Sequence, residues 1–337
     1  MLKKISLSCG LIAVLIWGCY SLLHQRVDAF LSQPVNVTNA ELFSVKHGQS
    51  LRALLVIFQQ KHWLDDAIGS HFIHRFYPQL THIKAGTYQI HPGESFKVIL
   101  SRFVAGDEFQ FSITMIEGSR FKDWLNKLSQ SPHLQHTLSG LTEPEIAEKL
   151  GISHKKLEGL FLAETYHFTD GTSDLDILQR AHVKLNQVLN QAWQNKAEHL
   201  PLKSPYEALI LASIIEKETS VDAERKRIAS VFVNRLNKKM RLQTDPTVIY
   251  GMGDQYNGNI RKKDLRTPTP YNTYVIRGLP PTPIATVGVA SLQAVMNPEK
   301  TNYLYFVASG QGGHVFSKSL SEHNRAVRNY LKQLRNK

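Results

Sequence analysis

An uncharged, mostly apolar segment at residues 5–23 most constrains how this 337-residue chain folds, because such a segment is stable only when it is removed from water. At a rise of about 1.5 Å per helical residue, the segment is just long enough to cross a bilayer. Lys3 and Lys4 precede it, and positive charge on that side predicts a cytoplasmic N-terminus. We therefore expect a cytoplasmic tail at 1–4, a single transmembrane anchor at 5–23 and export of the remaining residues.

Two alternatives to an uncleaved anchor remain open. A cleaved signal peptide would use residues 27–29, which form a poor cleavage site. A lipoprotein signal ending at Cys19 would need a small residue where Trp17 stands. The apolar stretch is longer than the usual core of a signal peptide, which favours the anchor.

The residue types outside this segment exclude several classes of site. Cys9 and Cys19 are the two cysteines of the chain, so its exported part has no disulfide, cysteine-bound zinc or cysteine nucleophile. Neither a metal-ligand spacing nor a phosphate-binding glycine loop is present, and the sequence predicts no metal and no cofactor. The net charge of +12 favours acidic partners, but the basic residues are scattered, which disfavours nucleic acid.

A compact unit is predicted at 43–106, after a polar linker at 24–42. Two transitions from strand to helix in this unit share a Gly-x-Ser sequence, which begins at Gly48 and at Gly93. In both, apolar residues follow at positions i, i+3, i+4 and i+7 of a helix that the serine can cap. A strand at 83–90 lies between them. This pattern indicates a small βα module, which serves as a spacer or as a binding module.

The region 107–337 contains most of the predicted elements, with a core at about 155–330. Alternating apolar residues indicate a strand at 109–115, and a second strand is expected at 303–307. Helices are expected to begin near Ser119, Thr142, Asp174, Ser204 and Ser321. The sequence therefore predicts an α+β chain: an N-terminal transmembrane helix, a small βα module and a mixed α/β domain.

The predicted helix at 205–218 is apolar almost all round, which is typical of a helix buried at the centre of a domain. Ser204 is its expected N-cap and Pro205 takes the first helical position. Glu207 stands where it would complete a capping box with Ser204.

Two carboxylates end this helix. Glu218 stands seven residues after Leu211 and continues the most aliphatic stripe, whereas Glu216 projects about 160° away from it. A carboxyl group among aliphatic side chains has a raised pKa, which a general acid needs in order to stay protonated near neutral pH. The alternative is a surface position for Glu218, where it would pair with Arg225 or Lys226.

Three runs around this helix resemble the YceG-like (MltG) family of endolytic murein transglycosylases. They are LASIIEKET at 211–219, ASVFVNRL at 229–236 and MRLQTDPTVIYG at 240–251. The resemblance continues in order through 271–274, 278–281, 284–285, 297–298, 303–307 and 313–316. It also identifies the unit at 43–106 as LysM-like and the region 107–337 as a catalytic domain whose central helix carries the catalytic glutamate.

The resemblance implies a reaction that needs one essential carboxyl group. A glutamate protonates the glycosidic oxygen between N-acetylmuramic acid and N-acetylglucosamine. The same residue then accepts a proton from the muramyl C6 hydroxyl, which closes on C1 and leaves a 1,6-anhydro end without consuming water. Family and periodicity both favour Glu218 for this role, with Glu216 as a possible supporting residue. An ordinary glycosidase would instead use a pair of carboxyl groups.

The resemblance and the polarity of the residues indicate a sugar-binding groove. Amide groups and aromatic faces suit N-acetyl groups and sugar rings, and the alternative for each residue is a buried hydrogen-bonding role in a long loop. The candidate residues are Arg241, Gln243, Thr244, Asp245, Tyr250, Asn272, Tyr274 and His314.

The resemblance also implies where such a protein acts. It implies an inner-membrane protein with its catalytic region in the periplasm, which cleaves nascent glycan strands and thereby ends their elongation. Peptidoglycan and its synthases are the implied partners. A non-catalytic scaffold that binds peptidoglycan and recruits synthesis enzymes remains the alternative.

Overall fold

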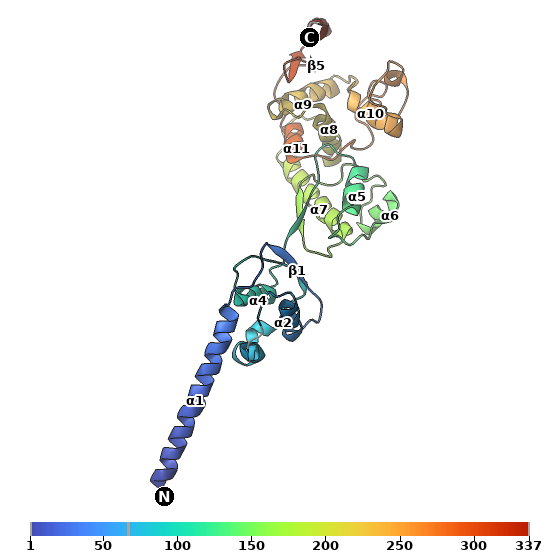
Figure 1. The fold of residues 1–337 in the computed structure, drawn as a ribbon. Helices are drawn as coiled ribbons and strands as arrows, with labels where there is room; N and C mark the ends of the chain where they lie inside the picture. The colour runs from blue at the N-terminus through green and yellow to red at the C-terminus, as the bar shows by residue number, and fades with distance from the viewer. Residues whose placement is uncertain (1, 66–67, 336–337) are drawn as a thin grey trace. The chain divides into compact units, whose positions relative to one another are not determined.

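The computed structural model describes residues 2–65 and 68–335, which form two compact units of mixed helix and strand (Figure 1). Unit 1 comprises Met1–Phe111 and His167–Gly171, and unit 2 comprises Ser112–Tyr166 and Thr172–Lys337. The described strands form three sheets of two strands each, β1 with β2, β3 with β4 and β5 with β6. The predicted α+β class is confirmed.

Helix α1, Leu2–Ser32, is longer than the predicted anchor and enters the core of unit 1 at its C-terminal end. The linker expected at 24–42 is therefore wrong in its first part, because Val27, Phe30 and Leu31 are buried. These residues have the i, i+3, i+4 spacing of an apolar helical face, and the polar residues around them, at 24–26, 28 and 32–33, concealed it. Among the residues searched, α1 is the one helix that is long and apolar enough to cross a membrane, over Gly10–Ser32.

The rest of unit 1 repeats a strand followed by a helix. Ser50 and Ser95 cap the two helices by accepting hydrogen bonds from Ala53 N and Val98 N, as predicted. The strands β1 and β2 pair antiparallel. In chain order the elements are β1 (Glu41–Val45), α2 (Leu51–Gln60), η1 (Ile68–Phe72), α3 (Ile73–Phe76), η2 (Pro78–Thr81), β2 (Gly86–Ile90) and α4 (Phe96–Ala105).

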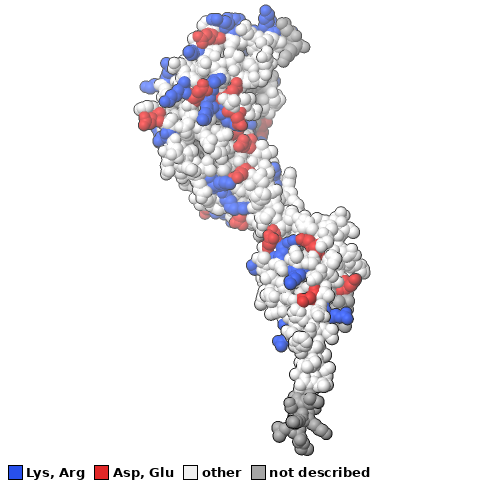
Figure 2. Space-filling view, turned by 90° about the vertical axis from the view of Figure 1, so that its left-hand side faces the viewer, with Lys and Arg blue, Asp and Glu red and all other residues white. Residues whose placement is uncertain are grey.

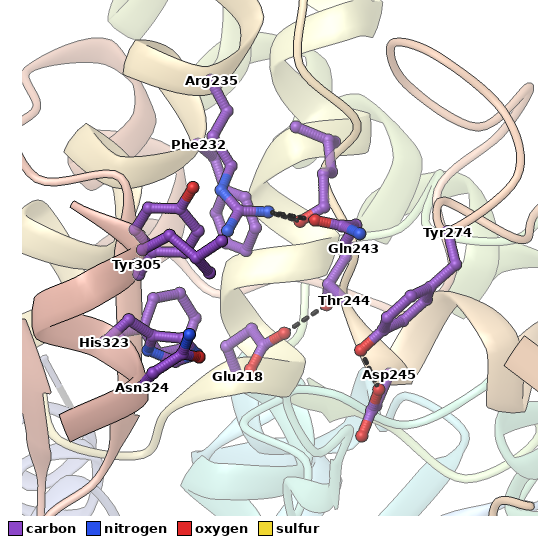
Figure 3. A pocket seen from close by; sticks show the side chains of 13 residues that line it. Glu218, Phe232, Arg235, Gln243, Thr244, Asp245, Tyr274, Tyr305, His323 and Asn324 are labelled. Atoms are coloured by element: carbon purple, nitrogen blue, oxygen red, sulfur yellow. Dashed lines mark hydrogen bonds between the residues drawn. The ribbon is translucent and has the colours of Figure 1, made fainter. Parts of the chain in front are cut away.

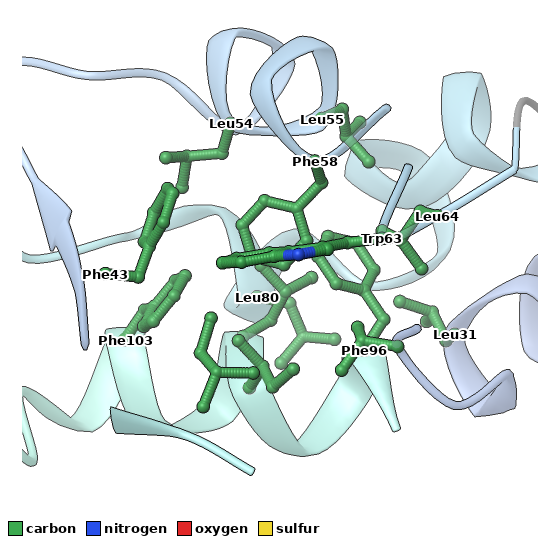
Figure 4. Packing of buried hydrophobic residues seen from close by; sticks show 14 of the residues in the cluster. Leu31, Phe43, Leu54, Leu55, Phe58, Trp63, Leu64, Leu80, Phe96 and Phe103 are labelled. Carbon is green, nitrogen blue, oxygen red and sulfur yellow. The ribbon is translucent and has the colours of Figure 1, made fainter. Parts of the chain in front are cut away.

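Aromatic side chains from different elements fill the core of unit 1 (Figure 4). Phe43 of β1 lies edge-on to Phe58 of α2, with ring centroids 5.0 Å apart, and Phe58 lies edge-on to Trp63 at 5.1 Å. Edge-to-face pairs of this kind stabilise a core beyond the area they bury. Leu31 of α1 belongs to the same cluster, so the end of α1 is part of the folded unit.

Unit 2 is mostly helical. Its elements, together with the sheet β3–β4, are β3 (Phe111–Thr114), α5 (Phe121–Ser129), α6 (Glu143–Lys149), β4 (Thr165–Phe168), α7 (Asp174–Gln194), α8 (Pro205–Glu218), α9 (Asp222–Asn237), α10 (Asp245–Met252), η3 (Gly253–Gln255), η4 (Asp264–Arg266), α11 (Val289–Met296), β5 (Tyr305–Ala308), β6 (His314–Ser317) and α12 (Leu320–Arg335). On the face of unit 2 visible in Figure 2, basic and acidic side chains are interspersed.

Helix α8 is the buried helix of unit 2. Every residue from Ala208 to Ile215 is buried, as its all-round apolar character predicts. Helices α7, α9, α10 and α11 all contact it. Ser204 caps it by accepting from Glu207 N, but the expected capping box is incomplete, because the Glu207 carboxylate accepts from Lys203 N instead.

Removal of residues 1–30 should unfold unit 1, whereas removal of residues 1–22 should leave it folded. The longer deletion takes Val27 and Phe30 out of the core, and each buried apolar side chain contributes roughly 1.5–3 kcal/mol to stability. Hydrogen exchange of the α2 amides, measured by mass spectrometry, should be slow in the shorter deletion and fast in the longer one. Equal protection of α2 in both proteins would show that the end of α1 is dispensable.

Candidate active site

The last residue of α8, Glu218, opens into a cavity of about 420 Å³ (Figure 3). The helix stops there because Thr219 adopts an extended conformation at the C-cap. The side chains that line the cavity come from α8, α9, α10, β5, α12 and the loops next to them. They are Glu218, Phe232, Arg235, Leu242, Gln243, Thr244, Asp245, Tyr274, Tyr305, Phe306, Leu320, His323 and Asn324.

Thr244 is the direct hydrogen-bond partner of Glu218. Its hydroxyl donates to Glu218 Oε1. Thr244 is buried, and it is held in place by Thr273, whose Oγ1 accepts from Thr244 N at 3.0 Å and lies 2.8 Å from Thr247 Oγ1. This network of buried threonines fixes the donor that faces the carboxyl group.

Burial raises the pKa of Glu218 to about 7. The hydrogen bond from Thr244 acts in the opposite direction, because it stabilises the ionised carboxylate. The negative charge of Asp245 raises the pKa further, and the charge of His314 lowers it. Glu218 can therefore both give up and accept a proton near neutral pH, which is the property required of a general acid and base.

Four of the predicted site residues lie together at this cavity: Gln243, Thr244, Asp245 and Tyr274. The Tyr274 hydroxyl donates to Asp245 Oδ1 at 2.6 Å, so the two side chains form one wall (Figure 3). Gln243 has a positive φ of 52°, a conformation that is rare for residues other than glycine. Backbone strain of this kind is concentrated at functional sites.

The other predicted groove residues are not among those that line the cavity. Arg241 donates to the Tyr274 carbonyl at 3.0 Å and is exposed. Asn272 is buried and donates to the carbonyls of Asp264 and Thr267, which is the loop-bracing alternative considered for it. The His314 backbone N donates to Glu224 Oε1 at 2.9 Å, and His314 Nδ1 lies 2.8 Å from Glu224 Oε2.

Tyr250 belongs to a second buried cluster, which includes an acid that sequence reasoning missed. The Glu158 side chain hydrogen-bonds to Tyr250 and accepts from Phe121 N at 2.9 Å. Burial raises the pKa of Glu158 to about 7, against the effect of these hydrogen bonds. The Arg120 guanidinium lies over the Tyr250 ring, 5.2 Å from its centroid. The cluster ties α10, which carries Tyr250, to α5.

Glu216 points away from the cavity residues, as its position on α8 predicts. Its Oε2 accepts from Gly288 N at 3.0 Å, directly before α11, and its Oε1 lies 3.5 Å from Arg225 Nη2. Burial and the charge of Glu216 raise the pKa of nearby Glu117. Arg225, the surface partner considered for Glu218, therefore pairs with Glu216, and it also pairs with Asp222.

Arg235, Tyr305 and His323 line the cavity but were not predicted as site residues. The Arg235 guanidinium donates to the carbonyls of Leu304 and Leu242 and lies 4.9 Å from the centroid of the Tyr305 ring. A signal for Arg235 was present, since it is a lone cation near the end of a mostly apolar helical run. Tyr305 and His323 gave none, because only tertiary packing brings β5 and α12 to the end of α8.

Comparison with known proteins places the chain in a family. A family model described as the YceG-like family matches residues 43–329, which is most of the chain. The chain belongs to the YceG-like family. The resemblance found in the sequence is thereby confirmed.

Relatives of known name support the same assignment. An endolytic murein transglycosylase of Bacillus subtilis is 32% identical to this YceG-like chain over 310 residues, which cover 86% of the chain and 84% of the relative. An endolytic murein transglycosylase of Streptococcus pneumoniae is 28% identical over 198 residues, 56% of the chain and 35% of the relative. The crystal structure of a YceG-like protein from Listeria monocytogenes has 31% identity and a TM-score of 0.54, covering 86% of this chain and 99% of that one.

Replacement of the carboxyl group in Glu218→Gln should stabilise unit 2 at pH 8 but not at pH 5. The folded protein binds a proton at Glu218 more tightly than the unfolded chain does, so this residue costs stability as pH rises through about 7. We expect a gain on the order of 2 kcal/mol at pH 8, measured by chemical denaturation. The control is Glu198→Gln, because the Glu198 side chain is 93% exposed and its replacement should change stability at neither pH. A Glu218→Gln protein no more stable than wild type at pH 8 would contradict the raised pKa.

Proposed function

We propose that this chain is an endolytic murein transglycosylase in which Glu218 is the single catalytic acid and base. One observation carries the proposal: in a YceG-like chain, a carboxyl group with a pKa of about 7 ends the buried helix and opens into a polar cavity. The names of the Bacillus and Streptococcus relatives support the same activity.

In the proposed reaction, Glu218 begins protonated and gives its proton to the oxygen that links N-acetylmuramic acid to N-acetylglucosamine. The bond from C1 of the muramyl residue to that oxygen breaks. The carboxylate then takes the proton of the muramyl C6 hydroxyl, whose oxygen bonds to C1. The products are a 1,6-anhydro end and a new sugar hydroxyl, and Glu218 is protonated again, so no water is needed.

The surroundings of Glu218 suit both halves of this cycle. Asp245 holds a negative charge nearby, which favours the protonated acid, while the Thr244 hydroxyl stabilises the carboxylate after the proton has left. Asp245 itself accepts a hydrogen bond from Tyr274. We assign Asp245 to tuning the charge of Glu218 rather than to activating water.

The remaining cavity residues are proposed to bind the sugar chain. Tyr274 offers an aromatic face for a sugar ring, and Gln243 offers an amide for an N-acetyl group. The Tyr305 ring already packs against Arg235 and His323, so we assign it to shaping the cavity wall. For Arg241, Tyr250, Asn272 and His314 the contacts described above favour a bracing role, since none of them lines the cavity. We likewise assign Glu216 to holding Gly288, at the start of α11, against the end of α8.

The exported location is also a proposal. The long apolar helix α1 supports a single-pass anchor in the inner membrane at 5–23, with residues 1–4 in the cytoplasm and both units in the periplasm. We propose that the LysM-like unit at 43–106 binds peptidoglycan. A chain held at the membrane in this way meets nascent strands first, which fits a role in ending their elongation beside peptidoglycan synthases.

The change Glu218→Gln should abolish cleavage and leave the fold intact, because an amide cannot exchange the proton. The test uses protein lacking residues 1–22, incubated with purified nascent glycan or sacculi, with products analysed by mass spectrometry. Wild-type products should carry 1,6-anhydro ends, which differ from hydrolysis products by one water. Cleavage by folded Glu218→Gln protein would reject Glu218. Products with reducing ends would indicate an ordinary hydrolase, and inactive wild-type protein would favour the scaffold alternative.

Two neighbouring substitutions should move the pH profile of kcat/KM in opposite directions. Thr244→Val removes a hydrogen bond that lowers the pKa of Glu218, so the alkaline limb should shift to higher pH. Asp245→Asn removes a negative charge that raises this pKa, so the alkaline limb should shift to lower pH. The profile is read from initial rates of glycan cleavage between pH 5 and 9. Shifts in the same direction would show that the alkaline limb does not report Glu218.

A further inference from the structure

The rest of unit 1 packs closely against the C-terminal part of α1. Gly69 of η1 lies so near to α1 that a Cβ atom at this position would meet the Arg26 carbonyl oxygen at 2.5 Å and Phe30 Cβ at 3.1 Å. Val27 and Leu31 on the same helix are fully buried. The unit therefore continues the helix directly, without a flexible joint between them.

The segment at 68–82, which comprises η1, α3 and η2, packs against one side of α1 at the point where the apolar stretch ends, mainly through η1; we call it the collar. Phe76 of the collar packs on Tyr20 and His24, with ring centroids 5.1 and 5.2 Å away. The Tyr77 ring lies 5.9 Å from that of His24, and its hydroxyl donates to Asp28. Figure 1 shows the collar, in cyan, at the end of unit 1 nearest the free part of α1, with β1 at the other end.

The position of the collar along α1 matches the depth of lipid headgroups. Residues 23 to 28 span about 7.5 Å of helix at about 1.5 Å per residue. The headgroup layer occupies roughly 5–8 Å on each side of the hydrocarbon core. If the anchor ends at Leu23, Tyr77, which contacts His24 and Asp28, lies within that layer, where the amphipathic rings of tyrosine and tryptophan are favoured. Phe76, which packs on both Tyr20 and His24, lies at the boundary with the hydrocarbon core.

The collar carries one arginine, Arg75, and no acidic residue. Helix α2 adds Arg52 and also has no acidic residue, while Asp65 and Asp66 lie in the sequence between α2 and the collar. Asp28, the acid nearest on α1, is engaged by His24 and Tyr77. A groove of about 580 Å³ between α2 and the segment of η1 and α3 has an apolar part formed by leucine and valine and a polar part formed by arginine, glutamine, serine and histidine. Its residues are Leu51, Arg52, Leu55, Val56, Gln59, Ser70, His71 and His74.

We propose that the collar and this groove form a membrane-contact surface that lies in the headgroup layer of the bilayer holding α1 and binds anionic phospholipid headgroups. The inference rests on the proposed anchor. Arg52, Arg75 and Arg26 are exposed and supply the charge, while the groove offers an apolar wall to the upper part of an acyl chain. Such a contact fixes the orientation of unit 1 on the membrane.

The test measures the depth of three nitroxide labels in the full chain, with Cys9 and Cys19 replaced by serine. The labels are placed at Arg75→Cys in the collar, at Leu42→Cys in β1 and at Leu15→Cys in the anchor. The protein is reconstituted in phosphatidylcholine vesicles with 30% phosphatidylglycerol, and a nickel chelate on lipid headgroups relaxes nearby labels. We expect relaxation at position 75 to be at least fivefold faster than at position 42.

The label at position 15 distinguishes failure of the collar proposal from failure of the anchor proposal. If it lies in the hydrocarbon layer by its accessibility to oxygen, and positions 75 and 42 relax equally, the collar proposal is wrong while the anchor stands. If position 15 is exposed to water, the anchor is wrong and the collar proposal falls with it.

A charge variant tests lipid selectivity. The double change Arg52→Gln and Arg75→Gln should lower the amount of phosphatidylglycerol retained by the purified full chain at least threefold, measured by native mass spectrometry. The matched control changes two exposed cations of unit 2, Lys155→Gln and Arg261→Gln, and should retain the wild-type amount. Equal loss in both double variants, or no loss in either, would overturn the selectivity of the collar.

Discussion

The burial of α8 is the constraint on which the site depends. A helix that is apolar on every face is stable only when other elements cover it, and α7, α9, α10 and α11 do so. That covering ends at the last turn, where Glu218 meets the cavity. The packing that stabilises unit 2 thus also reduces the solvation of the Glu218 carboxyl group. The pKa of Glu218 is raised because the packing around α8 buries its carboxyl group.

Local patterns in the sequence predicted the parts of the fold that depend on local physics. The serine caps of α2 and α4 follow from residues at fixed spacing, and so does the burial of α8. The error at 24–42 has the same origin, because Val27, Phe30 and Leu31 form too short an apolar face to stand out among polar neighbours. Only the packing of α1 against η1 shows that these residues belong to a core.

The candidate site could be predicted only in part. The residues predicted between 241 and 250 were found because they are polar and lie in a run that resembles the family, and three of them, Gln243, Thr244 and Asp245, line the cavity. Tyr305 and His323 come from β5 and α12, and no local rule relates them to Glu218. Asn272 has the same chemistry as a sugar-binding amide, yet its donors are used by two backbone carbonyls. Residue type alone does not distinguish these two uses.

The position of Thr244 and Asp245 at the start of α10 has one further consequence. Thr244 lowers the proton affinity of Glu218 and the adjacent Asp245 raises it, and both move with the same helix end. If a long substrate pushes this end outward, both influences weaken together and partly cancel. A displacement of this helix end would therefore change the proton affinity of Glu218 less than the loss of either influence alone.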